Sequence, residues 1–238
     1  RIDGRPQTLQ RTCEDALRRL RTDVIDLYYL HRWDKSVPIE DSVGALSDLV
    51  RQGKVRHIGL SEVSAQTVRK AHAVHPLAAV QSEYSLWTRN PEIAVLATCR
   101  ELGIALVPYS PLARAYLADG LPDPAVLDEG DLRRRMPRFQ PQAYASNLEL
   151  LTPYRQIATR LGCSPAQLAL AWLLHQGDHV IPIPGTTRLD HLIDNLGATQ
   201  VELDDATLAE LDALINDRTI QGARHGAANL AEVDTEFF

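Results

Sequence analysis

The chain has 238 residues, 45% of them hydrophobic and 24% charged, and its formal net charge is -6. This composition is typical of one large globular domain or two small ones. The acidic balance and scattered arginines argue against general binding to nucleic acids or to membrane surfaces, and no apolar run is long enough to span a membrane. The three cysteines lie far apart and lack metal-ligand spacing, so we expect reduced thiols, no metal site and a cytoplasmic location.

Helix-like and strand-like segments alternate along the chain. Apolar residues at helical spacing indicate the helices, and short apolar runs that end in polar residues indicate the strands. In chain order the sequence predicts helix 8–20, strand 24–30, helix 39–54, strand 55–60, helix 64–72, strand 78–83, helix 91–103, strand 104–109, helices 148–161 and 164–176, strand 180–184, and helices 189–198 and 204–215. Thr8 is predicted to cap the first helix, and Gly53 to follow the second in the left-handed conformation.

The alternation breaks in a long segment that is rich in proline and arginine. Long loops within compact domains are usually functional lids or disordered segments. We interpret residues 112–147 as a mobile mouth loop that becomes ordered on binding, with a solvated linker as the alternative. Most of its arginines are expected to be solvated, although they are candidates for contacts to cofactor phosphates or an anionic substrate: Arg133, Arg134, Arg135 and Arg138. A polar C-terminal tail is predicted over 217–238.

Strands separated by helices pair in parallel through right-handed crossovers. No glycine-rich GxGxxG turn follows any predicted strand, which argues against a Rossmann-type nucleotide site. Polar residues instead come directly after each strand: His31, Ser61, Gln81, Tyr109-Ser110 and Gly185-Thr186-Thr187. In a (β/α)₈ barrel these positions face one mouth. A lone histidine after an apolar run is more often structural, but this convergence favours a functional role for His31.

Five segments resemble, in order, successive barrel segments of the aldo-keto reductases: LYYLHR, KVRHIGLSE, QSEYSLW, VPYSPLAR and IPGTTRLDHLIDNLGA. They are most similar to the branch that carries YYxHR and GLSE, and the similarity runs from residue 1 to about residue 216. The resemblance implies an α/β fold, a parallel (β/α)₈ TIM barrel. This chain would supply about the last five βα units of it, as a single incomplete barrel domain over 1–238. It also implies NADPH-dependent reduction of small aldehydes and ketones to alcohols.

The resemblance assigns roles to residues at the first four strand ends. His31 resembles the active-site histidine that orients and polarises the substrate carbonyl. Ser61 and Gln81 resemble the pair that hydrogen-bonds the nicotinamide carboxamide, which needs both donors and acceptors. Glu62 stands where most members have asparagine, and Tyr109 resembles the aromatic residue that stacks on the nicotinamide ring.

The remaining positions resemble a phosphate and adenosine site. Ser110, Leu112 and Arg114 resemble the pyrophosphate turn, where backbone N–H groups and a cation neutralise charge. A later segment resembles the loop that holds the adenosine 2′-phosphate; it consists of Gly185, Thr186, Thr187 and Arg188, with Asn195 near the adenine. His191 stands where many members have arginine, and histidine is a weaker, pH-dependent phosphate partner. Arg188 is therefore expected to carry most of the preference for NADP.

The tyrosine that donates the proton in this family, and the aspartate and lysine that tune it, belong to earlier barrel segments that the sequence does not contain. We expect the chain to be part of a longer enzyme, with the donor upstream of Arg1. The alternative is a truncated relative that binds nucleotide without turnover, as in a regulatory subunit. A barrel of another chemistry, such as an aldolase, is disfavoured because no strand-end lysine or carboxylate cluster is present. The sequence does not predict a particular substrate or an oligomeric state.

Overall fold

The computed structural model describes residues 2–238, which form two compact units. The first unit contains residues 2–82, Pro91–Val107 and Ala231–Phe237. The second contains Glu83–Asn90, Pro108–Leu230 and Phe238. Within residues 2–238, no helix combines the length and the apolar character needed to cross a membrane.

Four strands form one sheet in the order β1-β2-β3-β4. Their bounds are Ile25–Leu30 for β1, Val55–Ser61 for β2, Ala79–Glu83 for β3 and Ala105–Tyr109 for β4. The first two pairs are parallel, with Tyr29 opposite Gly59 and Ser61 opposite Gln81. These four strands were predicted from short apolar runs, and the structure confirms them to within one or two residues.

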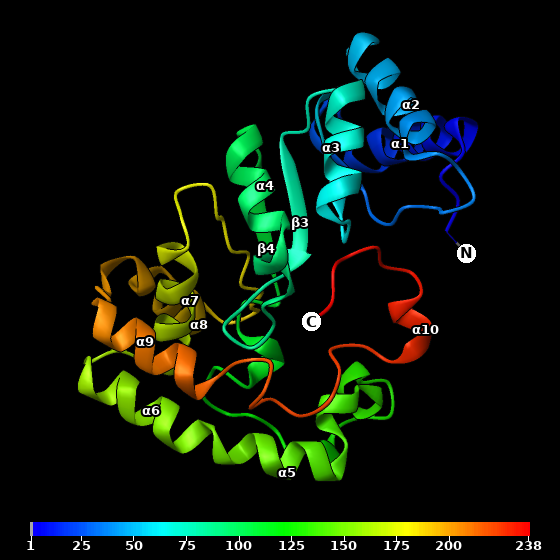
Figure 1. The fold of residues 1–238 in the computed structure, drawn as a ribbon. Coiled ribbons are helices and arrows are strands. Elements are labelled where there is room, and N and C mark those ends of the chain that lie inside the picture. The colour runs from blue at the N-terminus through cyan, green and yellow to red at the C-terminus, as the bar shows by residue number, and fades with distance from the viewer. Residues whose placement is uncertain (1) are drawn as a thin grey trace. The chain divides into compact units, whose positions relative to one another are not determined.

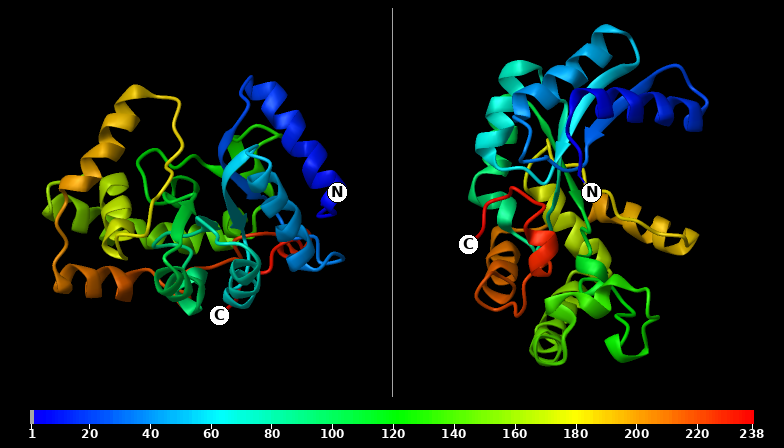
Figure 2. Two further views of the ribbon diagram at one scale, coloured as in Figure 1. Left: turned by 90° about the horizontal axis from the view of Figure 1, so that it is seen from above. Right: turned by 90° about the vertical axis from the view of Figure 1, so that its right-hand side faces the viewer.

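Helices α1 (Pro6–Leu20), α2 (Ile39–Arg51), α3 (Ala65–Val74) and α4 (Val95–Leu102) belong to the first unit, and each contacts the next (Figure 1; Figure 2). The Tyr28 hydroxyl on β1 donates a hydrogen bond to Thr12 of α1, so this side chain points toward the helices. Three strand residues with the same alternation are fully or almost fully buried: Leu30, Ile58 and Leu60. This face of the sheet therefore forms the core of the first unit.

The opposite face of the sheet is more open. Leu27 of β1 is 36% exposed, and His57, its register partner on β2, is exposed as well. Tyr29 lies on this face beside Gly59, where an added Cβ would stand 2.5 Å from the Tyr29 ring. Gly59 is therefore needed to admit the Tyr29 ring.

Helices dominate the second unit. Their bounds are Pro141–Glu149 for α5, Leu151–Arg160 for α6, Pro165–His175 for α7, Leu189–Gly197 for α8, Asp205–Leu214 for α9 and Ala227–Leu230 for α10. Helix α7 begins with the capping box formed by Ser164 and Gln167 and carries the fully buried Trp172. Tyr84, which is 0% exposed, packs edge-on against Trp172 and so lies in the core of this unit.

The prediction of a fifth strand at 180–184 is wrong. Among the described residues this segment has no strand of its own, although Val180 forms an isolated bridge and the Ile183 N–H donates to the Pro108 carbonyl of β4 at 3.0 Å. Pro182 and Pro184 lack the N–H groups that a ladder on the other side of the segment needs.

Two predicted helix starts are also corrected. Helix α1 begins at Pro6 with Arg5 at the cap position, so Thr8 is not the cap; its hydroxyl donates to Asp3 instead. Proline at the first helical position is pre-organised for the helix, which explains the earlier start. The predicted helix 91–103 is divided between a 3₁₀ turn, Asn90–Ile93, and α4, because Ala94 leaves the helical region with a φ of -156°.

The segment predicted as a loop over 112–147 contains local structure. Short 3₁₀ helices occur at Pro124–Val126, Leu132–Arg135 and Pro137–Phe139, and Ala113–Ala115 forms a turn with left-handed backbone angles. Helix α5 already starts at Pro141, earlier than the predicted start at Leu148, and it meets α6 end to end at Leu150 (Figure 1). Tyr144 of α5 stacks on Phe139, and this aromatic packing supplies stability that the weak periodicity did not reveal.

Candidate functional site

The carboxyl ends of β1, β2 and β3 carry the first group of predicted residues. His31 directly follows β1, and Ser61, which is 3% exposed, is the last residue of β2. Ser61 and Gln81 are register partners on neighbouring parallel strands, so their side chains project from the same face. The Glu62 N–H donates to the Gln81 carbonyl at 2.9 Å, which extends the pairing past the end of β2.

Tyr29 is a further member of this group, to which the sequence motifs assign no role. Its side-chain hydroxyl shares a hydrogen bond with the Gln81 side chain, and burial raises the pKa of Tyr29. The ring crosses β2 at Gly59, the residue between β1 and β3 that has no side chain. Tyr29 and His31 are two residues apart, and alternate residues of a strand point to the same face. This spacing was the sequence signal that could have linked them.

Arg32 joins His31 to Ser61. One Nη1 atom of Arg32 donates to the His31 carbonyl at 2.6 Å and to the Ser61 hydroxyl at 3.2 Å. Partial burial lowers the pKa of His31, and the Arg32 charge lowers it further, while Glu232 and Glu62 act in the opposite direction. The imidazole is therefore neutral at pH 7 and serves as a hydrogen-bonding group rather than a cation.

A C-terminal residue holds the turn that follows Ser61. Glu62 has a left-handed φ of 57°, and its carbonyl accepts a hydrogen bond from the Asp234 N–H at 2.9 Å. The Asp234 carboxylate accepts from the N–H and hydroxyl of Ser64 at 3.2 and 3.0 Å, and from the Thr67 hydroxyl at 2.7 Å. A partner this distant in sequence leaves no local signal, which is why sequence reasoning missed it.

The second unit contains a cavity of about 730 Å³ at the end of β4. Six of the residues predicted to bind a cofactor line it: Tyr109, Ser110, Leu112, Arg114, Gly185 and His191. Backbone strain gathers in its wall, because the lining residues Ser110, Arg114 and Ala115 have positive φ although none is glycine, as does the neighbouring Ala113. Such outliers cost of order 1–3 kcal/mol each and cluster at binding sites.

Arg114 has an unsatisfied donor in this cavity. Its Nε atom is buried and has no hydrogen-bond partner among residues 2–238. A buried donor without an acceptor is costly, and a guanidinium is suited to phosphate and carboxylate oxygens. The cavity wall therefore fits an anionic ligand that also presents a flat ring to Tyr109.

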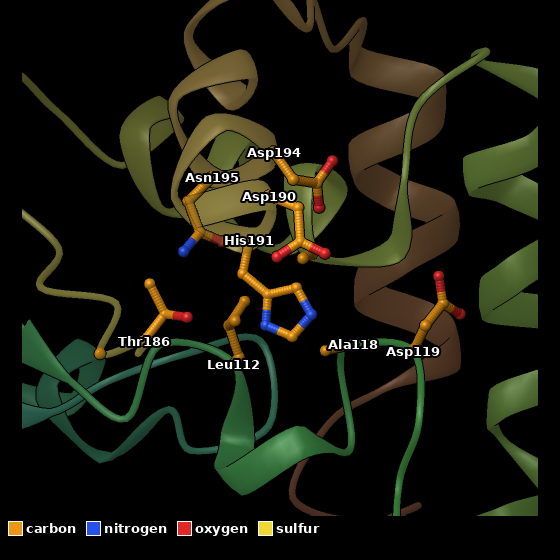
Figure 3. A pocket seen from close by; sticks show the side chains of 10 residues that line it. Leu112, Ala118, Asp119, Thr186, Asp190, His191, Asp194 and Asn195 are labelled. Atoms are coloured by element: carbon orange, nitrogen blue, oxygen red, sulfur yellow. The ribbon is translucent and has the colours of Figure 1, made fainter. Parts of the chain in front are cut away.

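A second pocket, of about 280 Å³, lies at the start of α8 (Figure 3). Its wall includes five of the predicted residues: Leu112, Gly185, Thr186, His191 and Asn195. Figure 3 shows the His191 ring beside the Asp190 carboxylate, with Asp194 and Asn195 above them. Asn195 is 9% exposed, and the Asp194 carboxylate accepts from the Ser164 hydroxyl at 2.8 Å.

Thr187 and Arg188 lie outside the walls of these two pockets. Arg188 donates from Nε to the Asp190 carboxylate at 3.0 Å, and its Nη2 atom contacts the other oxygen of the same carboxylate. This bidentate contact holds the pKa of Asp190 well below its usual range. The cation predicted to bind a phosphate is thus paired with an anion of its own chain, which sequence reasoning did not anticipate.

Arg138 is not solvated as predicted for most arginines of the mouth loop. Its side chain is 6% exposed, lies 3.8 Å from the Glu83 carboxylate and donates to the Thr88 hydroxyl at 3.0 Å. Arg224 and His225 lie 3.8 and 3.5 Å from the same carboxylate. The reason is charge compensation: Glu83 is 1% exposed, and a buried carboxylate is costly unless cations lie close to it.

The architecture defines the class of protein first: a parallel α/β fold whose strand ends carry the candidate site. Comparison then defines the family. The sequence pattern of the Aldo/keto reductase family matches residues 2–216. The chain is 45% identical over 239 residues to the aldo-keto reductase yakc (NADP(+)) of Schizosaccharomyces pombe, covering 98% of this chain and 70% of that relative.

Two solved structures resemble this fold. The thermostable aldo-keto reductase Tm1743, crystallised with the inhibitor epalrestat, matches with a TM-score of 0.69 and 31% identity over 88% of this chain and 67% of that one. The glycerol dehydrogenase AKR11B4 of Gluconobacter oxydans matches with a TM-score of 0.79 and 28% identity over 89% of this chain and 64% of that one. The chain therefore belongs to the aldo/keto reductase family, a family of oxidoreductases with a TIM-barrel fold, and the predicted family and fold class are confirmed.

Proposed function

We propose that this protein is an NADP(H)-dependent reductase of small aldehydes and ketones. The observation that carries the proposal is the cavity at the end of β4, in which Arg114 has a buried Nε atom without a partner and Tyr109 supplies an aromatic face. The name of the fission-yeast relative, an NADP(+) aldo-keto reductase, supports the choice of cofactor. When bound, the dinucleotide supplies the hydride.

The roles assigned to this chain's own residues are to bind the cofactor and to orient it. Ser61 and Gln81 are assigned to the carboxamide of the nicotinamide, with Tyr29 fixing the Gln81 amide. Tyr109 is assigned to stacking, while Ser110, Leu112 and Arg114 are assigned to the pyrophosphate. The loop from Gly185 to Arg188 is assigned to the 2′-phosphate. His191 and Asn195 are assigned to its adenosine end.

His31 is assigned to the substrate carbonyl. Because its pKa is lowered, the neutral imidazole presents a hydrogen bond to the carbonyl oxygen and polarises the C=O bond. We assign the proton that this oxygen takes up to a tyrosine outside residues 2–238, so His31 orients the substrate without being the donor.

Loss of NADPH absorbance with a reactive aromatic aldehyde tests the proposal. If the protein is a reductase, NADPH is consumed in the same amount as alcohol is formed. Binding of NADPH without turnover would favour the alternative, a nucleotide-binding relative with a regulatory role. Absence of binding would overturn both.

Arg114→Gln tests the cofactor cavity directly. Loss of the guanidinium should weaken the binding of NADPH and NADH alike, by about tenfold, because the pyrophosphate is common to both and charge-assisted hydrogen bonds are the strong ones. The matched control is Arg11→Gln on the exposed surface of α1, which should leave both affinities unchanged. Equal affinities for the Arg114 variant and the unaltered chain would remove this cavity from the proposal.

A cytoplasmic location remains a prediction that rests on the thiols. Cys13, Cys99 and Cys163 are free, and burial raises the pKa of the Cys99 thiol to about 12. A thiol in this state is protonated and unreactive at neutral pH.

A further inference from the structure

We propose that Asp190 and Asp131 are competing carboxylates. Each forms an ion pair with an arginine that would otherwise bind a phosphate of the cofactor. The inference rests on the proposed function, because it concerns the affinity and selectivity of the same cofactor site. Asp190 competes with the 2′-phosphate for Arg188. Asp131 competes with the pyrophosphate for Arg133.

The first competing carboxylate, Asp190, lies at the beginning of α8. Asp190 lies in the first turn of this nine-residue helix, where the N–H groups and the helix dipole attract an anion. Its carboxylate lies beside His191 in the pocket (Figure 3). The same carboxylate holds Arg188 through two contacts. Because Arg188 lies outside the wall of this pocket, a phosphate that binds it does so beside the pocket and meets a guanidinium that is already paired.

The second competing carboxylate, Asp131, also lies two positions from its arginine in the sequence. Asp131 and Arg133 line the 730 Å³ cavity together with Arg114. Arg133 donates to the Asp131 carboxylate from Nε at 3.0 Å and from Nη2 at 2.7 Å, and the pKa of Asp131 is lowered to about 2, chiefly by Arg133 and also by the Arg114 charge. The two arginines and the carboxylate form one charged cluster in the wall of the cavity.

The balance of charge favours displacement by a ligand. The Arg188–Asp190 pair is 65% and 60% exposed and the Arg133–Asp131 pair 25% and 24% exposed, so water screens the first pair most. Exposed ion pairs are weak. A phosphate with more than one negative charge therefore takes the arginine, but it must overcome both the existing pair and repulsion by the carboxylate.

The two pairs make different predictions because NADP+ and NAD+ differ only in the 2′-phosphate. Asp190→Asn should tighten NADP+ binding by about threefold or more and leave NAD+ binding unchanged, as expected for removal of a weak competing pair. Asp131→Asn should tighten the binding of both dinucleotides by a similar factor. Asparagine retains the cap that Asp131 provides to the Arg133 N–H.

Dissociation constants measured by isothermal titration calorimetry on the full chain provide the test, with Asp15→Asn as the control. Asp15 forms the same kind of exposed pair with Arg18 on α1, and its substitution should change neither constant. The inference is overturned for Asp190 if its variant binds NADP+ no more tightly, or tightens NAD+ equally, and for Asp131 if its variant binds neither more tightly. If the unaltered chain binds neither dinucleotide, the proposed function itself fails. Unchanged unfolding temperatures establish that the variants are folded.

Discussion

Arg188 is the residue on which cofactor selectivity is expected to depend. Arg188→Ala should raise the Michaelis constant for NADPH by about tenfold and that for NADH far less, because only NADPH carries the phosphate that we assign to this guanidinium, and charge-assisted hydrogen bonds are the strong ones. Steady-state kinetics with both cofactors measure the difference. An equal effect on both cofactors would contradict the assignment of Arg188. Since Arg188 is exposed and its partner is a nearby aspartate, the unfolding temperature should stay the same.

We expect Tyr29 to act through Gln81 and not on the substrate. Tyr29→Phe removes the hydroxyl that shares a hydrogen bond with the Gln81 side chain but keeps the ring beside Gly59. We expect the dissociation constants of both nicotinamide cofactors to rise about twofold to tenfold, the range for a lost neutral hydrogen bond. The matched change is Tyr28→Phe, whose hydroxyl contacts Thr12 of α1 on the other face, and which should leave cofactor binding unaltered.

At the scale of elements, the C-terminal segment stabilises the start of α3. Asp234→Ala removes the acceptor of three hydrogen bonds from Ser64 and Thr67, and we expect the free energy of unfolding in urea to fall by about 1–3 kcal/mol. Asp234→Asn keeps an acceptor oxygen and should lose less. Asp217→Ala, in an exposed part of the tail, should have no effect. A loss for Asp217→Ala as large as that for Asp234→Ala would contradict this role.

The Glu83 cluster connects the mouth loop to the segment that follows α9. Tyr116 and Asn147 donate to the Arg138 carbonyl at 2.6 and 3.3 Å, so this part of the loop is fixed through its backbone as well. Gly222 approaches closely: an added Cβ would stand 2.6 Å from the Arg138 Cα. These contacts explain why a segment without periodicity forms defined structure here.

Glu83→Gln tests the charge in this cluster. The substitution keeps the shape of the side chain but leaves Arg138 and Arg224 buried without a counter-charge, which should lower the free energy of unfolding by about 3–5 kcal/mol. Urea denaturation measures it, with Glu129→Gln in the exposed part of the loop as the control. A change within the error of the control would mean that hydrogen bonding rather than charge holds the cluster.

At the scale of the whole molecule, apolar surface remains uncovered on α8. Four residues at helical spacing are 46% to 72% exposed: Leu189, Leu192, Ile193 and Leu196. A contiguous apolar stripe of this kind binds hydrophobic dyes and promotes self-association. Leu192→Gln with Ile193→Gln should therefore reduce dye fluorescence and light scattering without a loss of stability, because surface substitutions change stability little.

Leu20→Gln provides the comparison for this stripe. Leu20 is 64% exposed at the end of α1, outside any such row of apolar residues on α8. Its substitution should leave the dye fluorescence unchanged. An equal decrease in both variants would mean that the fluorescence reports general surface hydrophobicity and not the α8 stripe.

The sequence by itself determined the local structure and the positions of the polar residues at the strand ends. Short apolar runs located β1 to β4, and the spacing of apolar residues located α2, α3 and α7, because these signals depend on neighbours within a few turns. The five ordered motifs led to the correct family. The roles assigned to His31, Ser61, Gln81 and the residues around Arg114 remain predictions that the proposed experiments test.

Only the tertiary structure decided which charges and backbone groups meet. Arg138 turns inward because the buried Glu83 needs cations, and Asp234 reaches α3 across a long stretch of chain. Asp190 forms an ion pair with Arg188. The segment 180–184 lacks a ladder because its prolines lack N–H groups. Most of these outcomes depend on desolvation and on partners distant in sequence, and neither can be read from a local pattern.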